Sequence, residues 1–178
     1  MGENNTNEDM DAEELVRRYA AGQRNFCRVN LRGANLSEVC LTEADLREAD
    51  LTGADLSWAI LHQADLRQAN LTQANLNGAN LIAAFLSMTV FNFADLSRAN
   101  LSRVTLFQAN LTDTNLTKAN LTWASLVEAD LTRAILHQTN LTGADLTRSN
   151  LREALLIEVS LTKATLTETI MPDGRVYN

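Results

Sequence analysis

The sequence is poor in the residues that mark several classes of protein. Its 178 residues include one proline, two cysteines and seven glycines, and aromatic residues make up only 5%. Two cysteines provide no disulfide framework in a chain of this length, which favours a reducing compartment. No apolar run approaches the ~18 residues of a transmembrane helix, and the polar, acidic first ten residues are unlike a secretory signal peptide. These features exclude a membrane protein, a disulfide-rich secreted mini-protein and a collagen-like fibre, and we expect a cytoplasmic protein.

Positive charge is also sparse, with 15 basic against 22 acidic residues and a formal net charge of −7. Six acidic residues precede the first basic residue, Arg17, so the rest of the chain is nearly balanced. An acidic lead of this kind is typical of a solvated tail, and we expect residues 1–10 to form a disordered acidic tail. No basic stripe is present, which predicts no direct contact with nucleic acid.

A five-residue repeat dominates the chain. From Leu31 to Leu166 every fifth position holds leucine, except for Phe91. The residue two positions earlier is usually alanine, and the residue between them is asparagine or aspartate in 18 of 28 units. The unit is therefore A-(D/N)-L-x-x, as in residues 64–68.

A five-residue period fits neither an α-helix nor a flat strand. Five residues advance an α-helix by about 140° beyond a full turn, and an odd period alternates between the two faces of a strand. All leucines can be buried only if the chain turns a corner once per unit and coils around them. Four corners give four units per coil and seven coils, with leucine and alanine inside and asparagine or aspartate outside, although composition alone also allows three sides.

The residues before the repeat predict a helix. Residues 11–21 begin with Asp11 as an N-cap, have Glu14 at the capping-box position and are followed by Gly22 as a stop. A solenoid needs a polar-faced cap, so we expect residues 11–25 to cap the first coil. The apolar stripe of the helix consists of Leu15, Val16 and Tyr19.

Beyond the repeat body, residues 26–170, a C-terminal tail comprises residues 171–178. This tail is too short to cover a whole coil, and the last coil is apolar even outside its core. The tail either folds across part of this end, with Met171 and Tyr177 as lids, or leaves two molecules to stack end to end. We favour the partial lid, because Pro172 begins a sharp turn, and expect a monomer or a weak end-to-end dimer.

The repeat resembles that of the pentapeptide-repeat proteins over about residues 26–171. The lead-in, residues 15–26, and the ending, residues 170–175, look like those of cyanobacterial members and suggest a stand-alone protein. The resemblance implies an all-β fold, a right-handed quadrilateral parallel β-helix with an N-terminal capping α-helix. It also implies an interaction protein without enzymatic activity, and some members of this type are tied to the regulation of cell differentiation.

No group of residues points to catalysis, a cofactor or a metal. His62 and His137 lie nearly four coils apart, follow leucines and are expected to point outward, so they cannot share a site. Cys27 and Cys40 form no C-x-x-C pair. Aspartates before leucine alternate with asparagines, which favours hydrogen bonding at the corners over a calcium site. We predict no enzyme and no catalytic, cofactor-binding or metal-binding residue.

Side chains depart most from the repeat in residues 81–93. Apolar residues occupy outward positions there and one coil later, and an exposed apolar cluster often marks a partner site. The alternative is that Phe91 in the core forces a local rearrangement that its neighbours pack. The candidate partner surface consists of Ile82, Phe85, Met88, Val90, Phe93 and Phe107.

The favoured function is a scaffold that binds a protein partner, without association with membranes. The alternative is a topoisomerase (gyrase) inhibitor or protector that mimics DNA, as some pentapeptide-repeat proteins do. The outward positions of the repeats carry 15 acidic and ten basic residues. This surplus is mild, because duplex DNA carries one negative charge per ~1.7 Å. The unbroken register also leaves no room for the long loop with which some topoisomerase-protecting members hold their partner.

Overall fold

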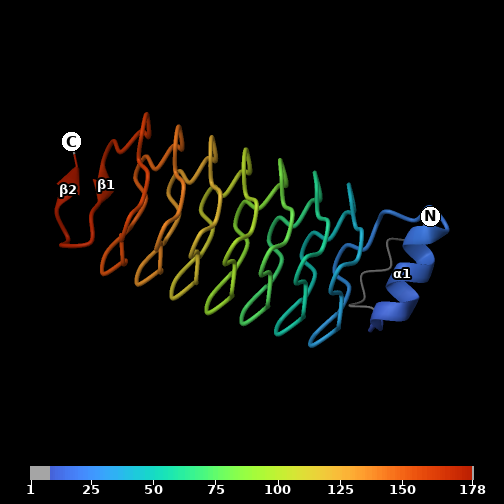
Figure 1. Ribbon diagram of the computed structural model, residues 1–178. Coiled ribbons are helices and arrows are strands. Elements are labelled where there is room, and N and C mark those ends of the chain that lie inside the picture. Colours follow the sequence, from blue (N-terminus) through green and yellow to red (C-terminus); the bar gives the residue numbers. More distant parts are fainter. Residues whose placement is uncertain (1–8, 178) are drawn as a thin grey trace.

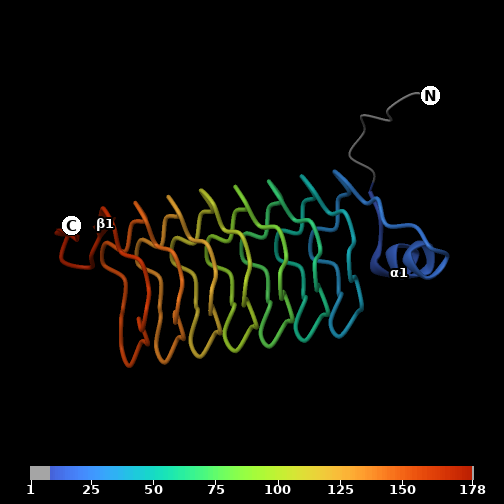
Figure 2. The ribbon, with the colours of Figure 1, turned by 90° about the horizontal axis from the view of Figure 1, so that it is seen from above.

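In the computed structural model the repeats form a regular solenoid (Figures 1 and 2). The structure describes residues 9–177. Isolated parallel β-bridges join each unit to the fourth unit after it, from Asn25↔Asp45 to Asn150↔Ile170. Four pentapeptide units therefore make one coil, and the predicted four-unit coil is confirmed.

Each coil has four sides, which we letter by their leucine columns. Side A contains the column that begins at Leu31, side B that of Leu36, side C that of Leu41 and side D that of Leu46. The two residues after each leucine form the corner that carries the letter of that side.

Leucine and alanine fill the interior, as the repeat predicts. The leucines from Leu31 to Leu151, together with Phe91, are at most 1% exposed. Each donates its N–H to a carbonyl on the next coil, for example Leu36 N to Asp55 O at 2.7 Å. Burial of one such side chain contributes about 1.5–3 kcal/mol, so the leucine columns are the main source of stability.

Regular strands are almost absent, in contrast to the all-β expectation. Within residues 9–177 the only strands are β1 (Thr169–Ile170) and β2 (Val176–Tyr177), which pair antiparallel. Elsewhere a single residue per unit forms a bridge. The reason is a β-turn in nearly every unit, in which the N–H of the residue at the alanine position bonds the preceding leucine carbonyl, as in Ala44 N to Leu41 O at 3.1 Å. The extended part of each side is therefore too short for a strand.

The last residue of each unit has a left-handed backbone whatever its type. The φ angle is 61° at Glu38, 58° at Trp58 and 60° at Lys163. Glycine adopts this conformation without steric cost, whereas most other residues avoid it. Hydrogen bonds between coils hold these residues in place, for example Glu38 N to Ser57 O at 2.8 Å.

Asparagine and aspartate fix the corners, as predicted. Their Oδ1 atom accepts the backbone N–H two residues later, at 3.1 Å from Asn75 to Asn77 and at 3.0 Å from Asp130 to Thr132. Such side-chain turns are typical of both residue types. An asparagine and an aspartate can therefore form the same corner, although only aspartate is charged.

The helix α1 (Ala12–Ala20) lies across the N-terminal end of the first coil (Figures 1 and 2). The Asp11 side chain caps its first turn. Leu15 is fully buried and Tyr19 packs against the core, whereas Val16 is exposed. The buried stripe is thus narrower than the sequence predicts.

Asp9 and Met10 correct the expected limit of the acidic tail. Asp9 forms a parallel bridge with Asn30, and Met10 is buried and donates its N–H to Asn30 O at 3.2 Å. These two residues extend the first coil because their backbone groups satisfy its free edge. The rest of the predicted disordered tail, residues 1–8, lies outside the described residues.

The C-terminal tail continues side A as far as Pro172 and then turns back, so that β2 pairs with β1. Glu153 donates its N–H to Pro172 O at 3.0 Å, and Met171 is half-buried against the core. Tyr177 is 53% exposed and is not the lid that the sequence predicts. The physical reason is the β1–β2 pairing, which directs β2 along the edge instead of across the last coil.

Ser149 is expected to weaken the core. Its fully buried hydroxyl has no hydrogen-bond partner among residues 9–177. Ser149→Ala should therefore raise the free energy of unfolding by about 1 kcal/mol, because it removes an unsatisfied polar group. Other hydroxyls in the alanine position each donate to a carbonyl of the preceding coil, namely those of Thr89, Thr114, Thr139 and Thr169.

The matched control is Thr114→Ala, which loses a hydrogen bond to Phe91 O of 2.9 Å. It should lower the free energy of unfolding by about 1 kcal/mol. Urea unfolding followed by circular dichroism measures both variants. A Ser149→Ala protein less stable than the parent would contradict the prediction.

Candidate functional site

The residues with catalytic chemistry do not converge. His62 lies on corner C and His137 on corner B, several coils apart. Cys40 is exposed, and hydrogen bonds from the backbone and hydroxyl of Thr42 hold the pKa of its thiol below the usual range. Burial raises the pKa of the Cys27 thiol. In the part of the chain that the structure describes, no group of three or more histidine, cysteine or acidic side chains is placed to hold a metal ion.

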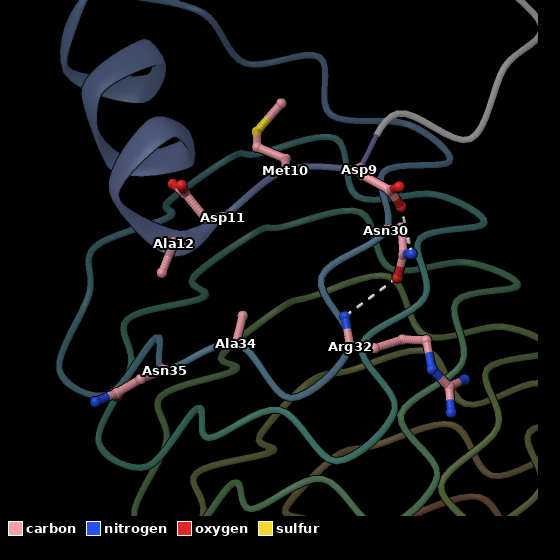
Figure 3. Close-up of a pocket in the computed structure, with 8 residues that line it drawn as sticks. All are labelled: Asp9, Met10, Asp11, Ala12, Asn30, Arg32, Ala34 and Asn35. Atoms are coloured by element: carbon pink, nitrogen blue, oxygen red, sulfur yellow. Dashed lines mark hydrogen bonds between the residues drawn. The ribbon is translucent and has the colours of Figure 1, made fainter.

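A pocket of about 510 Å³ separates the start of α1 from the first coil (Figure 3). Its polar groups are already engaged: Asn30 Nδ2 donates to Asp9 Oδ1 at 2.6 Å, and Arg32 Nη1 pairs with Asp50 at 3.0 Å. The remaining lining consists of Asp11, whose carboxylate caps α1 by accepting the Glu14 N–H at 2.8 Å, of Asn35, and of the apolar Met10, Ala12 and Ala34. The pocket follows from capping a square coil with a single helix.

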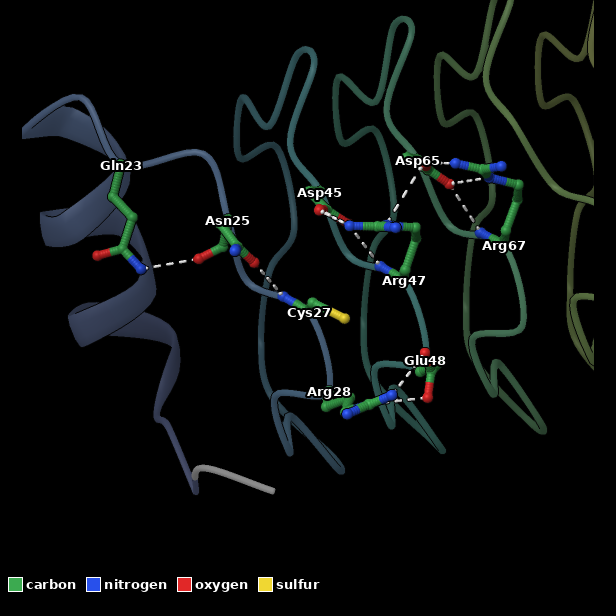
Figure 4. Close-up of polar contacts among 9 residues, drawn as sticks. All are labelled: Gln23, Asn25, Cys27, Arg28, Asp45, Arg47, Glu48, Asp65 and Arg67. Atoms are coloured by element: carbon green, nitrogen blue, oxygen red, sulfur yellow. Dashed lines mark hydrogen bonds and ion pairs between the residues drawn. The ribbon is translucent and has the colours of Figure 1, made fainter. Parts of the chain in front are cut away.

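Charged side chains on the first coils of side D neutralise one another (Figure 4). Arg47 Nε donates to Asp45 Oδ1 at 2.8 Å and lies 3.7 Å from Asp65 Oδ2, and Arg67 pairs with Asp65. The hydrogen bond from Arg47 holds the pKa of the Asp45 carboxyl below its usual range. Paired acids of this kind present little net negative charge.

Three predicted apolar residues adjoin this network. Phe85 continues the aspartate column of side D, because it bridges to Asp65. Met88 lies at the following corner and donates its N–H to the carbonyl of Phe107 at 2.9 Å, which places Phe107 beside it on the next coil. All three side chains are exposed. We call Phe85, Met88 and Phe107 the side D patch.

The other three predicted residues have different places. Ile82 and Val90 are half-buried at the edges of the side D patch, one at corner C and the other at the start of side A. Phe93 is 60% exposed but lies at corner A, a full side away from Met88. The structure therefore brings five of the six predicted residues together and leaves Phe93 apart.

Phe91 leaves the surrounding backbone in register. Its side chain is fully buried, and its N–H donates to Asn110 O at 2.7 Å, as the leucines do. It belongs to side A, whereas Phe85 and Phe107 lie on side D. The inter-coil hydrogen bonds continue on both sides of it.

Two exposed tryptophans were missed in the sequence. Trp58 at corner B is 55% exposed and Trp123 at corner C is 59% exposed. Each ring lies over a glycine of the next coil: a Cβ at Gly78 would be 2.6 Å from the Trp58 ring, and one at Gly143 would be 2.5 Å from the Trp123 ring. The signal that could have revealed them is the spacing of four units between each tryptophan and its glycine.

Within residues 9–177 no helix has the length and apolar character needed to cross a membrane.

The family model for pentapeptide repeats matches residues 25–48, 30–68, 49–87, 74–113, 94–133 and 134–171. No protein among those with curated functions matches the sequence significantly.

Solved structures include similar proteins. HetL from the cyanobacterium Nostoc sp. strain PCC 7120, a pentapeptide repeat protein involved in heterocyst differentiation regulation, is 33% identical over 94% of this chain and all of its own, with a TM-score of 0.45. The pentapeptide repeat protein alr5209 of Nostoc is 33% identical over 70% of this chain and 84% of its own, with a TM-score of 0.48. A pentapeptide repeat protein of the Arabidopsis thaliana thylakoid lumen is 37% identical over 60% of this chain and 70% of its own, with a TM-score of 0.33.

Proposed function

The chain belongs to the pentapeptide-repeat family, and from this premise we propose that it is a non-enzymatic scaffold that binds a protein partner through the side D patch. The observation that carries the proposal is the exposure of Phe85, Met88 and Phe107 side by side on one face. Soluble surfaces rarely hold such a cluster unless it contacts a partner.

Family membership also bears on the fold and the compartment. Pentapeptide-repeat proteins form right-handed quadrilateral β-helices, and we propose the same hand for this solenoid, in agreement with the general rule for parallel crossovers. We propose the cytoplasm as its compartment, because reduced cysteines suit it, although one relative belongs to the thylakoid lumen.

Folding does not require the side D patch. The position of Phe85 holds aspartate at Asp45, Asp65 and Asp145 of the same column, so a polar residue is compatible with this corner. Phe91 does not account for the patch either, because its unit keeps the regular inter-coil hydrogen bonds. Apolar side chains placed where the fold accepts polar ones support a role in recognition.

The test restores the repeat at the patch. The double variant Phe85→Asn with Phe107→Thr gives both positions residues that the repeat uses elsewhere, so the fold should be kept. Ile135→Asn, which removes an exposed apolar residue from side B, is the matched control. Affinity capture from a native lysate, quantified by mass spectrometry, should show one protein that the parent and the control retain and the double variant loses. Equal capture by all three proteins would contradict the proposal.

A supercoiling assay with purified gyrase separates the scaffold from the alternative function of topoisomerase inhibition. We expect no dose-dependent effect, because ion pairs such as Arg47–Asp45 and Arg133–Asp113 break up the negative surface that DNA mimicry needs. A dose-dependent effect would favour the alternative function.

A further inference from the structure

Side C differs from the other sides in its charge. Between Glu43 and Glu158, neither side C nor the corners B and C that border it carry an acidic residue. In the same stretch the other sides carry aspartates, among them Asp130 on side A, Asp95 on side B and Asp65 on side D. A protein of net charge −7 thus has one long surface without negative charge.

Cations gather along both edges of this surface. Within this stretch Arg98 and Lys118 lie at corner B and Arg103 lies at corner C, and Lys163 continues the column of corner C at the end of the surface, on the coil of Glu158. Across residues 9–177 these four side chains form no ion pair or hydrogen bond, and Arg152 on side A is the other cation of this kind. Most of the remaining arginines are paired with acids. The unpaired positive charge of the repeats is therefore concentrated at side C.

The asparagines of side C, between corners B and C, offer hydrogen-bond donors. Oδ1 of Asn80, Asn100 and Asn140 accepts the N–H two residues later, at 3.2, 3.2 and 3.0 Å. The three Nδ2 groups donate to no other residue of the described chain. Aspartate caps the same corner geometry at Asp130, so folding does not require amides here. A surface of cations and free amide donors is complementary to carboxylates.

The two tryptophans complete the edges. The Trp58 ring covers Gly78, which precedes Arg98 in the column of corner B, and Trp123 lies between Arg103 and Gly143 in that of corner C. Each edge therefore combines one exposed aromatic ring with two free cations. Such flat rings supply apolar contact area without the entropy cost of a flexible chain.

We propose that side C, with corners B and C, is a docking surface for an acidic segment of a partner protein. The four cations pair with its carboxylates, the asparagine amides donate to its oxygen atoms, and the tryptophan rings cover its apolar atoms. Coils are spaced about 4.8 Å apart, so Arg98 and Lys163 are separated by roughly 14 Å along the axis. This distance matches about four residues of an extended peptide.

Charge favours a short acidic segment over a nucleic acid. A polynucleotide needs many phosphate contacts, whereas side C offers four cations on a chain of net charge −7. The surface shares no residue with the side D patch. The proposal therefore stands or fails independently of the proposed function.

Intrinsic fluorescence provides a direct test, because both tryptophans of the chain flank side C. A peptide of ten glutamates, titrated into the full-length protein at low salt, should change the tryptophan emission saturably. The apparent affinity should fall as salt is added, since exposed charges are screened. Lys118→Glu should weaken binding about tenfold. The fold should accept this variant, because Glu38 and Glu158 occupy equivalent places in the same column.

Two controls match the variants in charge. Arg152→Glu makes the same change on side A and should alter the affinity less than about twofold.

Asn100→Asp should also weaken binding. The fold should accept it, because a similar stacked pair is already present, in which Asn115 Nδ2 donates to Asp95 Oδ1 at 3.0 Å. Asn70→Asp on side A is its control. No saturable change, equal losses in Lys118→Glu and Arg152→Glu, or tighter binding of a ten-nucleotide thymidine oligonucleotide would each overturn the proposal.

Discussion

Leu116→Lys is expected to lower the free energy of unfolding by at least about 3 kcal/mol. Leu116 is fully buried on side B, and its carbonyl accepts the buried hydroxyl of Thr139 at 2.7 Å. A lysine there would lose the apolar contacts and place an ammonium group in a column of leucines with no carboxylate to pair with. Because every coil contacts only its two neighbours, the damage divides the stack into two shorter halves.

The control for this variant is Thr117→Lys, the next position along the chain. Thr117 faces outward, and its hydrogen bonds are made by its backbone: its N–H donates to Asn115 Oδ1 at 3.1 Å and its carbonyl accepts the Arg98 N–H at 2.9 Å. Urea unfolding followed by tryptophan fluorescence and circular dichroism should leave this control near the parent and shift Leu116→Lys strongly. Coincident unfolding curves for the two variants would show that Leu116 does not point inward.

Deletion of residues 171–178 is expected to turn a monomer into an associating protein. The tail supplies Met171, which packs against the core, and Pro172 O, which accepts the Glu153 N–H. In the full-length protein the leucines of the last coil, Leu156, Leu161 and Leu166, are already half-buried at the open end. Without the tail, the unit of Leu151 also becomes part of the exposed edge. Exposed edges with apolar side chains and unpaired N–H groups favour pairing with another chain.

A shorter truncation distinguishes the two parts of the tail. Removal of residues 176–178 deletes β2 but keeps Met171 and Pro172, and β2 is exposed, so this variant should stay monomeric. Light scattering across a concentration series gives the mass of each form. A full-length protein that is already a tight dimer, and remains one after the longer deletion, would rule out a protective role for the tail.

The parts of the fold that depend on the five-residue unit could be predicted from the sequence. The unbroken spacing from Leu31 to Leu166 determined which side chains are buried, and the residue before each leucine determined the corner hydrogen bonds. Both follow from contacts between near neighbours in the chain. The left-handed backbone at corners such as Glu38 went unforeseen, because only glycine signals it in a sequence and hydrogen bonds between coils impose it on other residues.

The candidate surface was predictable in part. Apolar residues in polar positions pointed to Phe85, Met88 and Phe107, and their proximity follows once four units make a coil. The separation of Phe93 from Met88 was not predicted. The two residues lie at successive corners, and the whole of side A lies between them, which only the closed coil shows. The two tryptophans were overlooked for a similar reason, since stacking over Gly78 and Gly143 is a relation between neighbouring coils.

The amino-acid sequence by itself determined the period, the inward leucines and the polar exterior. The tertiary structure decided which residues share a side: the cations at the edges of side C, the ion pairs of side D, the buried Leu15 beside the exposed Val16, and the direction of β2. The physical reason is the range of the interactions. The repeat depends on contacts within a single unit. The chemistry of the surface depends on residues that are one coil apart in the sequence, and these residues become neighbours only when the coil closes into four sides.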